Sequence, residues 1–380
     1  MHPPPRGGPV PGRLRPRSRR PLPEPARAAG AAAGRERPRR RSRRRRRRPE
    51  PVSRCLEVPE EFVGAPLDEL VASHWPRVAK GRLRELIRSG AITVGGRPAR
   101  PSQRLRADDV VLVEADPDEL PQVAPAGFEV RVLHQDEHLV AVDKPPGFPV
   151  EPGRWGEHPA TLTGALLDWA ASRRTAGGRR PPRPRALHRL DLGTSGVLLY
   201  ALSLEAERYY RELFATGRVE KVYHALVLGE VRRAGVVDEP IGPDPRRGGL
   251  MRIGRGKPAR TEYEPLRRYR GYTLVECRPR TGRTHQIRVH LAGIGHPLAV
   301  DPRYGGRDRI LLSEIKPGYK AKRGRAERPL IDRLTLHAAE VQLVSFQGEP
   351  LRIAAEHPKD LRVLLSKMER WRRAPEKNPG

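Results

Sequence analysis

The sequence has only two cysteines and no long apolar segment. Cys55 and Cys277 lie far apart without paired spacing, which excludes a disulfide framework and a metal site built from thiolates. No apolar run approaches the ~18 residues that cross a bilayer, and the amino end lacks the apolar core of a secretory signal. These absences predict a soluble, cytoplasmic protein with no membrane partner.

Acidic residues are scarce relative to basic ones. The chain has 75 Lys and Arg against 45 Asp and Glu, a formal net charge of +30. Such an excess favours a polyanion over a neutral metabolite as partner, because Lys and Arg neutralise phosphates and release their counterions. An anionic membrane surface would be attracted too, so charge alone does not choose. The 380 residues suffice for roughly two domains of ~150 residues.

Large apolar side chains are almost absent from the first 50 residues, which hold 18 Arg against 3 Glu. Such a segment buries too little surface to offset its ordering entropy, so we predict a disordered Arg/Pro-rich tail over 1–54. Its block "RRRSRRRRRR", Arg39 to Arg48, fits a nucleic-acid-binding arm or a nuclear-address sequence. The alternative, a merely solvated tail or an overlong start assignment, explains it more simply.

Ordinary globular sequence begins near residue 55. Leu67, Leu70 and Val71 are spaced for one helical face, and Leu83, Leu86 and Ile87 for another. Gly95-Gly96 between short strand-like runs indicates a hairpin, and "DDVVLVEA" adds a strand. The order helix, turn, basic helix, "V-x-G-x", strand resembles the small RNA-binding module called S-four over 55–116. That resemblance implies RNA contacts by the basic helix and hairpin. The residues concerned are Lys80, Arg82, Arg84, Arg88 and Arg97.

A linker over 117–127 precedes a larger domain that we place at 128–370, with a short tail at 371–380. "FEVRVLHQDEHLVAVDKPPG" predicts two strands around a polar turn, and the rest is mostly strands. Helices are expected at Leu162 to Ala171, at Leu204 to Ala215, and briefly after Thr284. The predicted class is α+β with a central, mainly antiparallel sheet.

The stretch "HRLDLGTSG", His188 to Gly196, places one acid, Asp191, just before the apolar strand that starts at Val197. In an Asp-x-Gly sequence such as Asp191-Leu192-Gly193, the Asp most often only caps a turn. At a sheet margin, however, loops carry functional groups, and a carboxylate there can act as nucleophile or general base.

Two further motifs carry side chains suited to the same chemistry. In "KVYHALVL" a period of two places Lys221 and Tyr223 on one strand face, where Tyr223 is either a sheet aromatic or a ring that stacks on a base. In "RTGRTHQIRVH" a helix from Thr284 would hold Arg288 one turn inside it, near Arg283. Two arginines can clamp phosphate or keep a carboxylate ionised, and either can equally be a surface charge.

A metal site is the competing interpretation of this third motif. His285, His290 and His296 cluster, but their gaps of five and six lack the helical i,i+4 spacing of a zinc pair. No acidic residue intervenes. We therefore expect no metal.

Together the three motifs resemble the RluA-type family of RNA pseudouridine synthases over roughly Val130 to Leu365. The shared patterns are "HRLD-x-x-TSG", "K-x-Y-x-A" and "GRTHQIRVHLA…G-x-P…D…YGG", followed by "LTLHAAEVQL" and "HPKDLRVLL". An S-four module in front is typical of the ribosomal members. The resemblance implies isomerisation of uridine in RNA without cofactor or metal.

By the family pattern, Asp191 is the essential acid, Tyr223 contacts the target base and helps to move protons, and Arg288 pairs with Asp191. Arg189 matches the residue associated with flipping the base out, which is needed because atoms inside a stacked helix are out of reach. We expect a monomer that acts on large-subunit ribosomal RNA. Transfer RNA is the alternative substrate, and a non-catalytic RNA-binding or ribosome-assembly factor is the alternative class.

Overall fold

The computed structural model describes residues 53–123, 127–151, 160–172, 183–305, 307–321 and 324–374. The Arg-rich segment through residue 52 lies outside this range, so its predicted disorder and RNA contacts stay predictions. Within the described part, no helix is long and apolar enough to cross a membrane.

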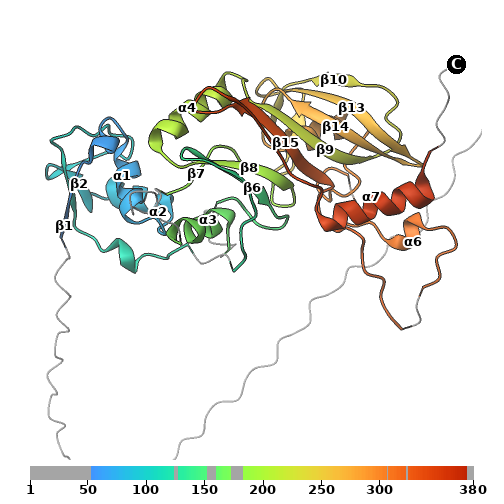
Figure 1. Ribbon diagram of the computed structural model, residues 1–380, viewed down its shortest axis with the longest axis horizontal. Coiled ribbons are helices and arrows are strands. Elements are labelled where there is room, and N and C mark those ends of the chain that lie inside the picture. The colour runs from blue at the N-terminus through green and yellow to red at the C-terminus, as the bar shows by residue number, and fades with distance from the viewer. Residues whose placement is uncertain are drawn as a thin grey trace, which may run out of the picture. The chain divides into compact units, whose positions relative to one another are not determined.

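A small four-stranded antiparallel sheet forms the amino-terminal part of the described chain (Figure 1). Its strands, in spatial order, are β1 (Arg54–Glu57), β4 (Val110–Val113), β2 (Ile92–Val94) and β3 (Arg97–Pro98). Helices α1 (Leu67–His74) and α2 (Lys80–Arg88) bury the apolar faces that the spacing predicted, in a core of their own. Gly95 and Gly96, both at positive φ, make the predicted hairpin turn between β2 and β3.

A ten-stranded mixed sheet is the centre of the larger part of the chain, and it confirms the expected α+β class. Its main path runs β10-β13-β14-β9-β15-β8-β6-β5, with β16 paired to β15 and β7 to β8. Every pair is antiparallel except β8 with β15. The bounds are β5 (Val132–Gln135), β6 (Leu139–Lys144), β7 (Arg185–Ala186), β8 (Ser195–Ala201), β9 (Glu220–Leu228), β10 (Gly235–Asp238), β13 (Arg260–Tyr269), β14 (Tyr272–Pro279), β15 (Leu336–Val344) and β16 (Pro350–Ala354).

Two helices cover opposite faces of β8, at the bounds that the sequence predicted. Leu198 and Tyr200 join the core beneath α3 (Leu162–Ala171), whereas Val197 and Leu199 join the core beneath α4 (Leu204–Ala215). A strand buried on both faces reads as a continuous apolar run, because its side chains alternate between the two cores. Both helices start at a hydroxyl N-cap, Thr161 for α3 and Ser203 for α4.

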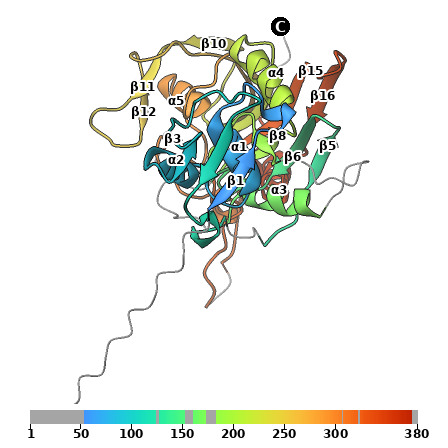
Figure 2. The same cartoon turned by 90° about the vertical axis from the view of Figure 1, so that its left-hand side faces the viewer.

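The other end of the sheet is covered by α5 (Gln286–Gly293), α6 (Leu312–Ile315) and α7 (Lys359–Arg372). Helix α7 was not predicted from the sequence, although Leu361, Leu364 and Met368 recur at helical spacing and are fully buried. A two-stranded hairpin, β11 (Ile241–Pro243) with β12 (Met251–Ile253), lies beside α5 (Figure 2). Short 3-10 turns, η1 (Glu60–Phe62) and η2 (Pro117–Glu119), complete the described elements.

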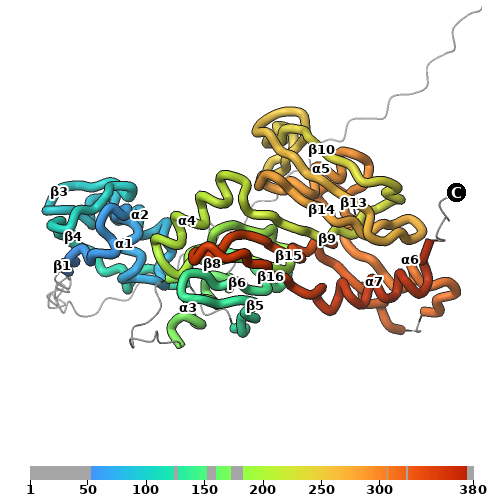
Figure 3. Tube along the Cα trace, turned by 45° about the horizontal axis from the view of Figure 1, so that its top comes forward, coloured from blue at the N-terminus to red at the C-terminus, as the bar shows by residue number. Residues whose placement is uncertain are grey.

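The parallel contact between β8 and β15 requires the glycine of the "TSG" motif. Gly196 has φ +110°, and a Cβ there would lie 2.1 Å from the backbone oxygen of Ala338 on β15. Only glycine permits both this dihedral and this approach. The close pairing, visible in Figure 3, places the start of β8 at the centre of the sheet, directly after the loop that carries Asp191.

Candidate active site

The loop between β7 and β8 contains Asp191, and hydrogen bonds to its backbone hold it in place. Lys144, at the end of β6, is fully buried and donates hydrogen bonds to the carbonyl oxygens of Leu192 at 3.1 Å and Thr194 at 2.8 Å. The Thr194 amide donates to the Asp191 carbonyl at 3.0 Å. These bonds fix the backbone around Asp191, whose side chain keeps 26% of its surface exposed. The carboxylate is thus both positioned and accessible.

Arg288 of α5 joins Asp191 to a second, buried carboxylate. One terminal nitrogen of Arg288 donates to Asp191 Oδ2 at 2.9 Å, while its Nε and other terminal nitrogen donate to Asp301 at 2.7 and 2.9 Å. Burial opposes the charge of Arg288, but the carboxylates of Asp301 and Asp191 outweigh it and raise its pKa. The guanidinium also lies 5.0 Å from the ring centre of Tyr304.

Asp301 lies in the third sequence motif but was not predicted as a site residue. It is fully buried and accepts both the forked Arg288 contact and the backbone N–H of Arg303 at 3.1 Å. Its signal is an acid directly after the buried run Leu298–Val300, inside the third motif. An acid at the end of an apolar run needs a cationic partner, but the sequence does not say which one.

Tyr223 and Lys221 both face the region of Asp191 from β9. Tyr223 is half-buried, and burial together with the nearby charge of Asp191 raises the pKa of its phenol, which therefore keeps its proton at neutral pH. The Lys221 ammonium donates to the Thr281 carbonyl at 3.1 Å. Burial and the charge of Arg280 lower its pKa to about 8.

The turn before α5 differs from the prediction that the helix starts at Thr284. The helix begins two residues later, at Gln286, because His285 at φ 57° adopts the left-handed conformation and interrupts it. The Gln286 side chain stabilises the turn by accepting from the Thr281 hydroxyl at 2.7 Å and from the Arg283 amide at 3.0 Å. The buried amide of Gln286 thus orients the segment from which Arg288 projects.

The three clustered histidines have separate partners. His285 Nδ1 is 2.9 Å from the Tyr304 hydroxyl, and its Nε2 is 4.0 Å from Asp191 Oδ1. His290 contacts the Thr261 hydroxyl and the Glu239 carbonyl, and His296 contacts the Leu228 carbonyl. Among the described residues, no group of three or more His, Cys, Asp or Glu side chains is placed to hold a metal ion.

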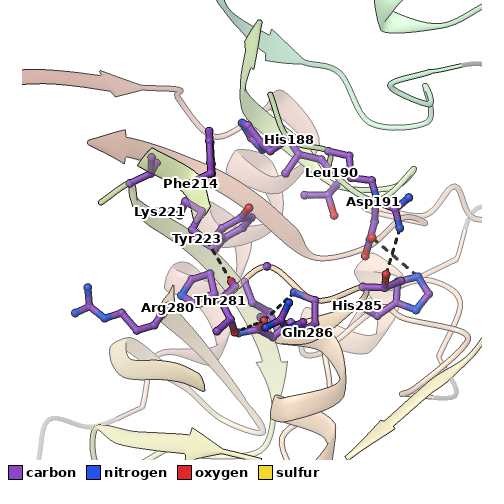
Figure 4. A pocket seen from close by; sticks show the side chains of 18 of the residues that line it. His188, Leu190, Asp191, Phe214, Lys221, Tyr223, Arg280, Thr281, His285 and Gln286 are labelled. Carbon is purple, nitrogen blue, oxygen red and sulfur yellow. Dashed lines mark hydrogen bonds and ion pairs between the residues drawn. The ribbon is translucent and has the colours of Figure 1, made fainter. Parts of the chain in front are cut away.

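A cavity of about 760 Å³ collects these groups (Figure 4). All five residues predicted for the larger domain line it, namely Asp191, Tyr223, Arg288, Arg189 and Arg283. Lys221 and Arg280, which the prediction did not include, add two more cations. Among the described residues that line the cavity, Asp191 is the only acid. The arrangement offers one carboxylate in a cationic, partly enclosed space.

Arg189 and Arg283, the two arginines predicted to bind RNA in the larger domain, form hydrogen bonds only to neutral groups of the described residues. Arg189 is exposed and donates to the Thr284 hydroxyl at 3.2 Å, which bridges the Asp191 loop and the turn before α5. Arg283 is half-buried and donates from Nε to the Pro258 carbonyl at 2.9 Å. Neither forms an ion pair within the described part of the chain. Both charges therefore remain available to a polyanion.

The five cations predicted in the small sheet unit are not equivalent. Lys80 pairs with Glu69, Arg84 with Asp68 at 2.6 Å, and Arg82 with Glu85 at 2.9 Å. Arg88 and Arg97 are exposed and have no carboxylate partner among the described residues. These two keep the free charge that the prediction assigned to the whole set.

Comparison with known proteins identifies the relatives of this chain. The sequence pattern of a family described as RNA pseudouridylate synthase matches residues 138–293. A protein of Xanthomonas campestris named ribosomal large subunit pseudouridine synthase D is 35% identical, over 81% of this chain and 90% of the relative. A protein of the same name from Nitrosomonas europaea is also 35% identical, over 82% and 86%. A solved structure of human RNA pseudouridylate synthase domain containing 4 aligns with a TM-score of 0.47 and 26% identity, over 63% and 93% of the two chains.

Proposed function

Because this chain belongs to the RluA-type family of RNA pseudouridine synthases, and so isomerises uridine in RNA, we propose that its substrate is large-subunit ribosomal RNA. The names of the two relatives described above support this target, and both align over most of their length. Transfer RNA is the alternative target for the same chemistry. We place the activity in the cytoplasm and assign it to a monomer.

Asp191 is the group that we propose carries the reaction. The observation behind this is that Asp191 is the sole acid among the described residues that line a cationic cavity, where it contacts Arg288, which in turn contacts buried Asp301. The glycosidic bond from C1′ to N1 breaks, a bond from C1′ to C5 forms, and the C5 hydrogen is exchanged for one on N1. Attack on the sugar and removal of a sugar proton both require an ionised carboxylate.

The neighbouring side chains have complementary roles in this proposal. Arg288 orients the Asp191 carboxylate, because its guanidinium is already fixed on Asp301 before substrate arrives. Tyr223 offers a ring for the detached base and a protonated hydroxyl for proton transfer. Arg189, exposed at the rim, takes the place of the flipped base in the RNA stack. The reaction is an isomerisation, so it consumes no co-reactant.

We propose that the small sheet unit over 55–116 binds RNA, that 117–127 links it to the catalytic domain over 128–370, and that 371–380 is a tail. Arg88 and Arg97 support the RNA-binding role, because both are exposed and neither has a carboxylate partner within the part of the chain that the structure describes. In this arrangement the small unit contributes affinity, and the cavity around Asp191 contributes chemistry.

The test is the variant Asp191→Asn, assayed on ribosomal RNA that lacks the modification. Asn keeps the turn and Arg288 keeps Asp301, so we expect a folded protein that binds RNA and forms no pseudouridine in chemical mapping. Asp308→Asn is the matched control, because Asp308 is exposed and pairs with its neighbour Arg309. Pseudouridine formation by Asp191→Asn near the control level would overturn the assignment. Modification of transfer RNA but not ribosomal RNA by the wild type would overturn the target.

A further inference from the structure

The cavity has a second end that the chemistry of Asp191 does not use. Figure 4 shows His188, Phe214 and Lys221 gathered on one side of it, and Asp191 and His285 on the other. The walls of the second end come from the carboxyl end of α4 and the start of β9. A single base held against Tyr223 leaves this end free for the rest of the RNA chain.

Lys221 is a cation without a carboxylate partner among the described residues. Its ammonium has three donors, and the Thr281 carbonyl accepts one of them. The adjacent acid, Glu220, forms an ion pair with Arg278 instead. A cation that is largely buried and has no anionic partner carries a desolvation cost, which binding an anion offsets. The geometry of this end therefore suits an anionic ligand.

The groups around Lys221 fit a nucleotide. Burial and the charge of Lys221 lower the pKa of His188 to about 3, so His188 is neutral and accepts from the Leu199 amide at 3.2 Å. Its ring lies 5.2 Å from that of Phe214, and together they form an aromatic wall. A cation beside an aromatic wall is how proteins hold single-stranded nucleic acid.

The spacing along β9 relates this end to the target base. Lys221 and Tyr223 are two residues apart on one face, which is about 6.6 Å along a strand. A base against Tyr223 and a phosphate at Lys221 therefore belong to the same or to neighbouring nucleotides.

We infer that Lys221 binds one of the two backbone phosphates that flank the target uridine, so that the cavity recognises a segment of RNA rather than a lone nucleoside. This inference rests on the proposed function. The competing role for Lys221 is purely structural, through its bond to the Thr281 carbonyl and hence to the turn before α5. A structural role would disturb Arg288 and lower the turnover number, whereas phosphate binding acts on affinity.

The first experiment compares wild type with Lys221→Met on a short RNA containing the uridine that the wild type modifies. We expect the dissociation constant to rise about tenfold and the slope of log affinity against log salt to lose about 0.7, with the melting temperature unchanged. Lys316→Met, directly after α6 and outside the cavity lining, is the control for removing one positive charge.

The second experiment replaces each flanking phosphate in turn by an uncharged methylphosphonate. At one of the two positions, wild-type affinity should fall about tenfold while Lys221→Met loses nothing further. Equal losses in both proteins at both positions, or an unchanged dissociation constant for Lys221→Met, would overturn the inference. Absence of pseudouridine formation by the wild type would instead overturn the proposed function.

A pH profile keeps the inference testable if Lys221→Met folds poorly. The titratable or charged groups around Lys221 are His188, Tyr223, Arg280 and the Glu220–Arg278 pair. Between pH 7 and 9 only Lys221 changes charge among them, so wild-type affinity should decline as the pH rises through about 8. Lys221→Arg stays charged and should show no decline. Identical profiles would contradict phosphate binding by Lys221.

Discussion

Asp301→Asn tests whether a buried carboxylate remote from the substrate sets the activity of the site. Asp301 is fully buried and receives two hydrogen bonds from Arg288, whose side chain is only 4% exposed. Asn retains an acceptor for the Arg303 amide, but it removes the charge and one half of the fork. The substitution therefore perturbs the charge that holds Arg288 and leaves the shape nearly unchanged.

The expected loss of stability follows from burial. Removing one partner of a buried ion pair costs about 3–5 kcal/mol, and the lower end applies because Arg288 keeps Asp191. A loss of about 3 kcal/mol corresponds to a fall of roughly 6–12 °C in melting temperature, at 2–4 °C per kcal/mol. Because Arg288 loses its anchor, we also expect the turnover number to fall at least about tenfold with little change in RNA affinity.

The assay is a melting curve with pseudouridine formation under saturating RNA, and Asp308→Asn is the control. A melting temperature within about 1 °C of wild type together with wild-type turnover would refute the reasoning, because Asp301 would then neither stabilise the fold nor position Arg288.

The double variant Asp191→Asn with Asp301→Asn adds a stricter test. It leaves the buried Arg288 without a carboxylate, so its destabilisation should exceed the sum of the two single effects by about 0.5–3 kcal/mol. Additive effects would show that the two acids do not act through Arg288.

Two further predictions concern RNA binding and pH. Changing Arg88 and Arg97 together to Ala should weaken RNA binding and flatten its salt dependence while leaving turnover at saturation unchanged. Arg82→Ala only breaks a pair with Glu85 and should weaken binding less. Equal losses of affinity in a filter-binding titration would contradict this. Burial lowers the pKa of His337 to about 4 from 6.5, so between these values the unfolded chain holds a proton that the folded chain lacks. The contribution of His337 to the free energy of unfolding should therefore fall by roughly 3 kcal/mol as the pH drops through this window. His337→Gln should reduce the total acid-dependent fall in urea titrations by about that amount, and an unaltered fall would exclude a contribution from His337.

Local sequence patterns were sufficient to predict most of the secondary structure. Hydroxyl caps and apolar spacing specify α3 and α4 within their own residues, so their bounds were predicted correctly. The start of α5 was predicted two residues too early, because the left-handed His285 is held by a distant contact with Tyr304. Helix α7 was missed for another reason. Its apolar residues recur at helical spacing, but the segment was assigned only to a family motif and not to a helix.

The sequence by itself determined the family, the basic character and the identity of Asp191, Tyr223 and Arg288 as the candidate catalytic set, because motif residues and charge are properties of the chain alone. Only the tertiary structure decided which charges remain free. Ion pairing depends on side chains brought together from distant segments, as Arg288 is with Asp191 and Asp301. For the same reason the sequence treated Arg84 and Arg88 alike, whereas folding pairs Arg84 with Asp68 and leaves Arg88 exposed. Residue type sets what a side chain can do, and the fold sets the partners that decide what it does.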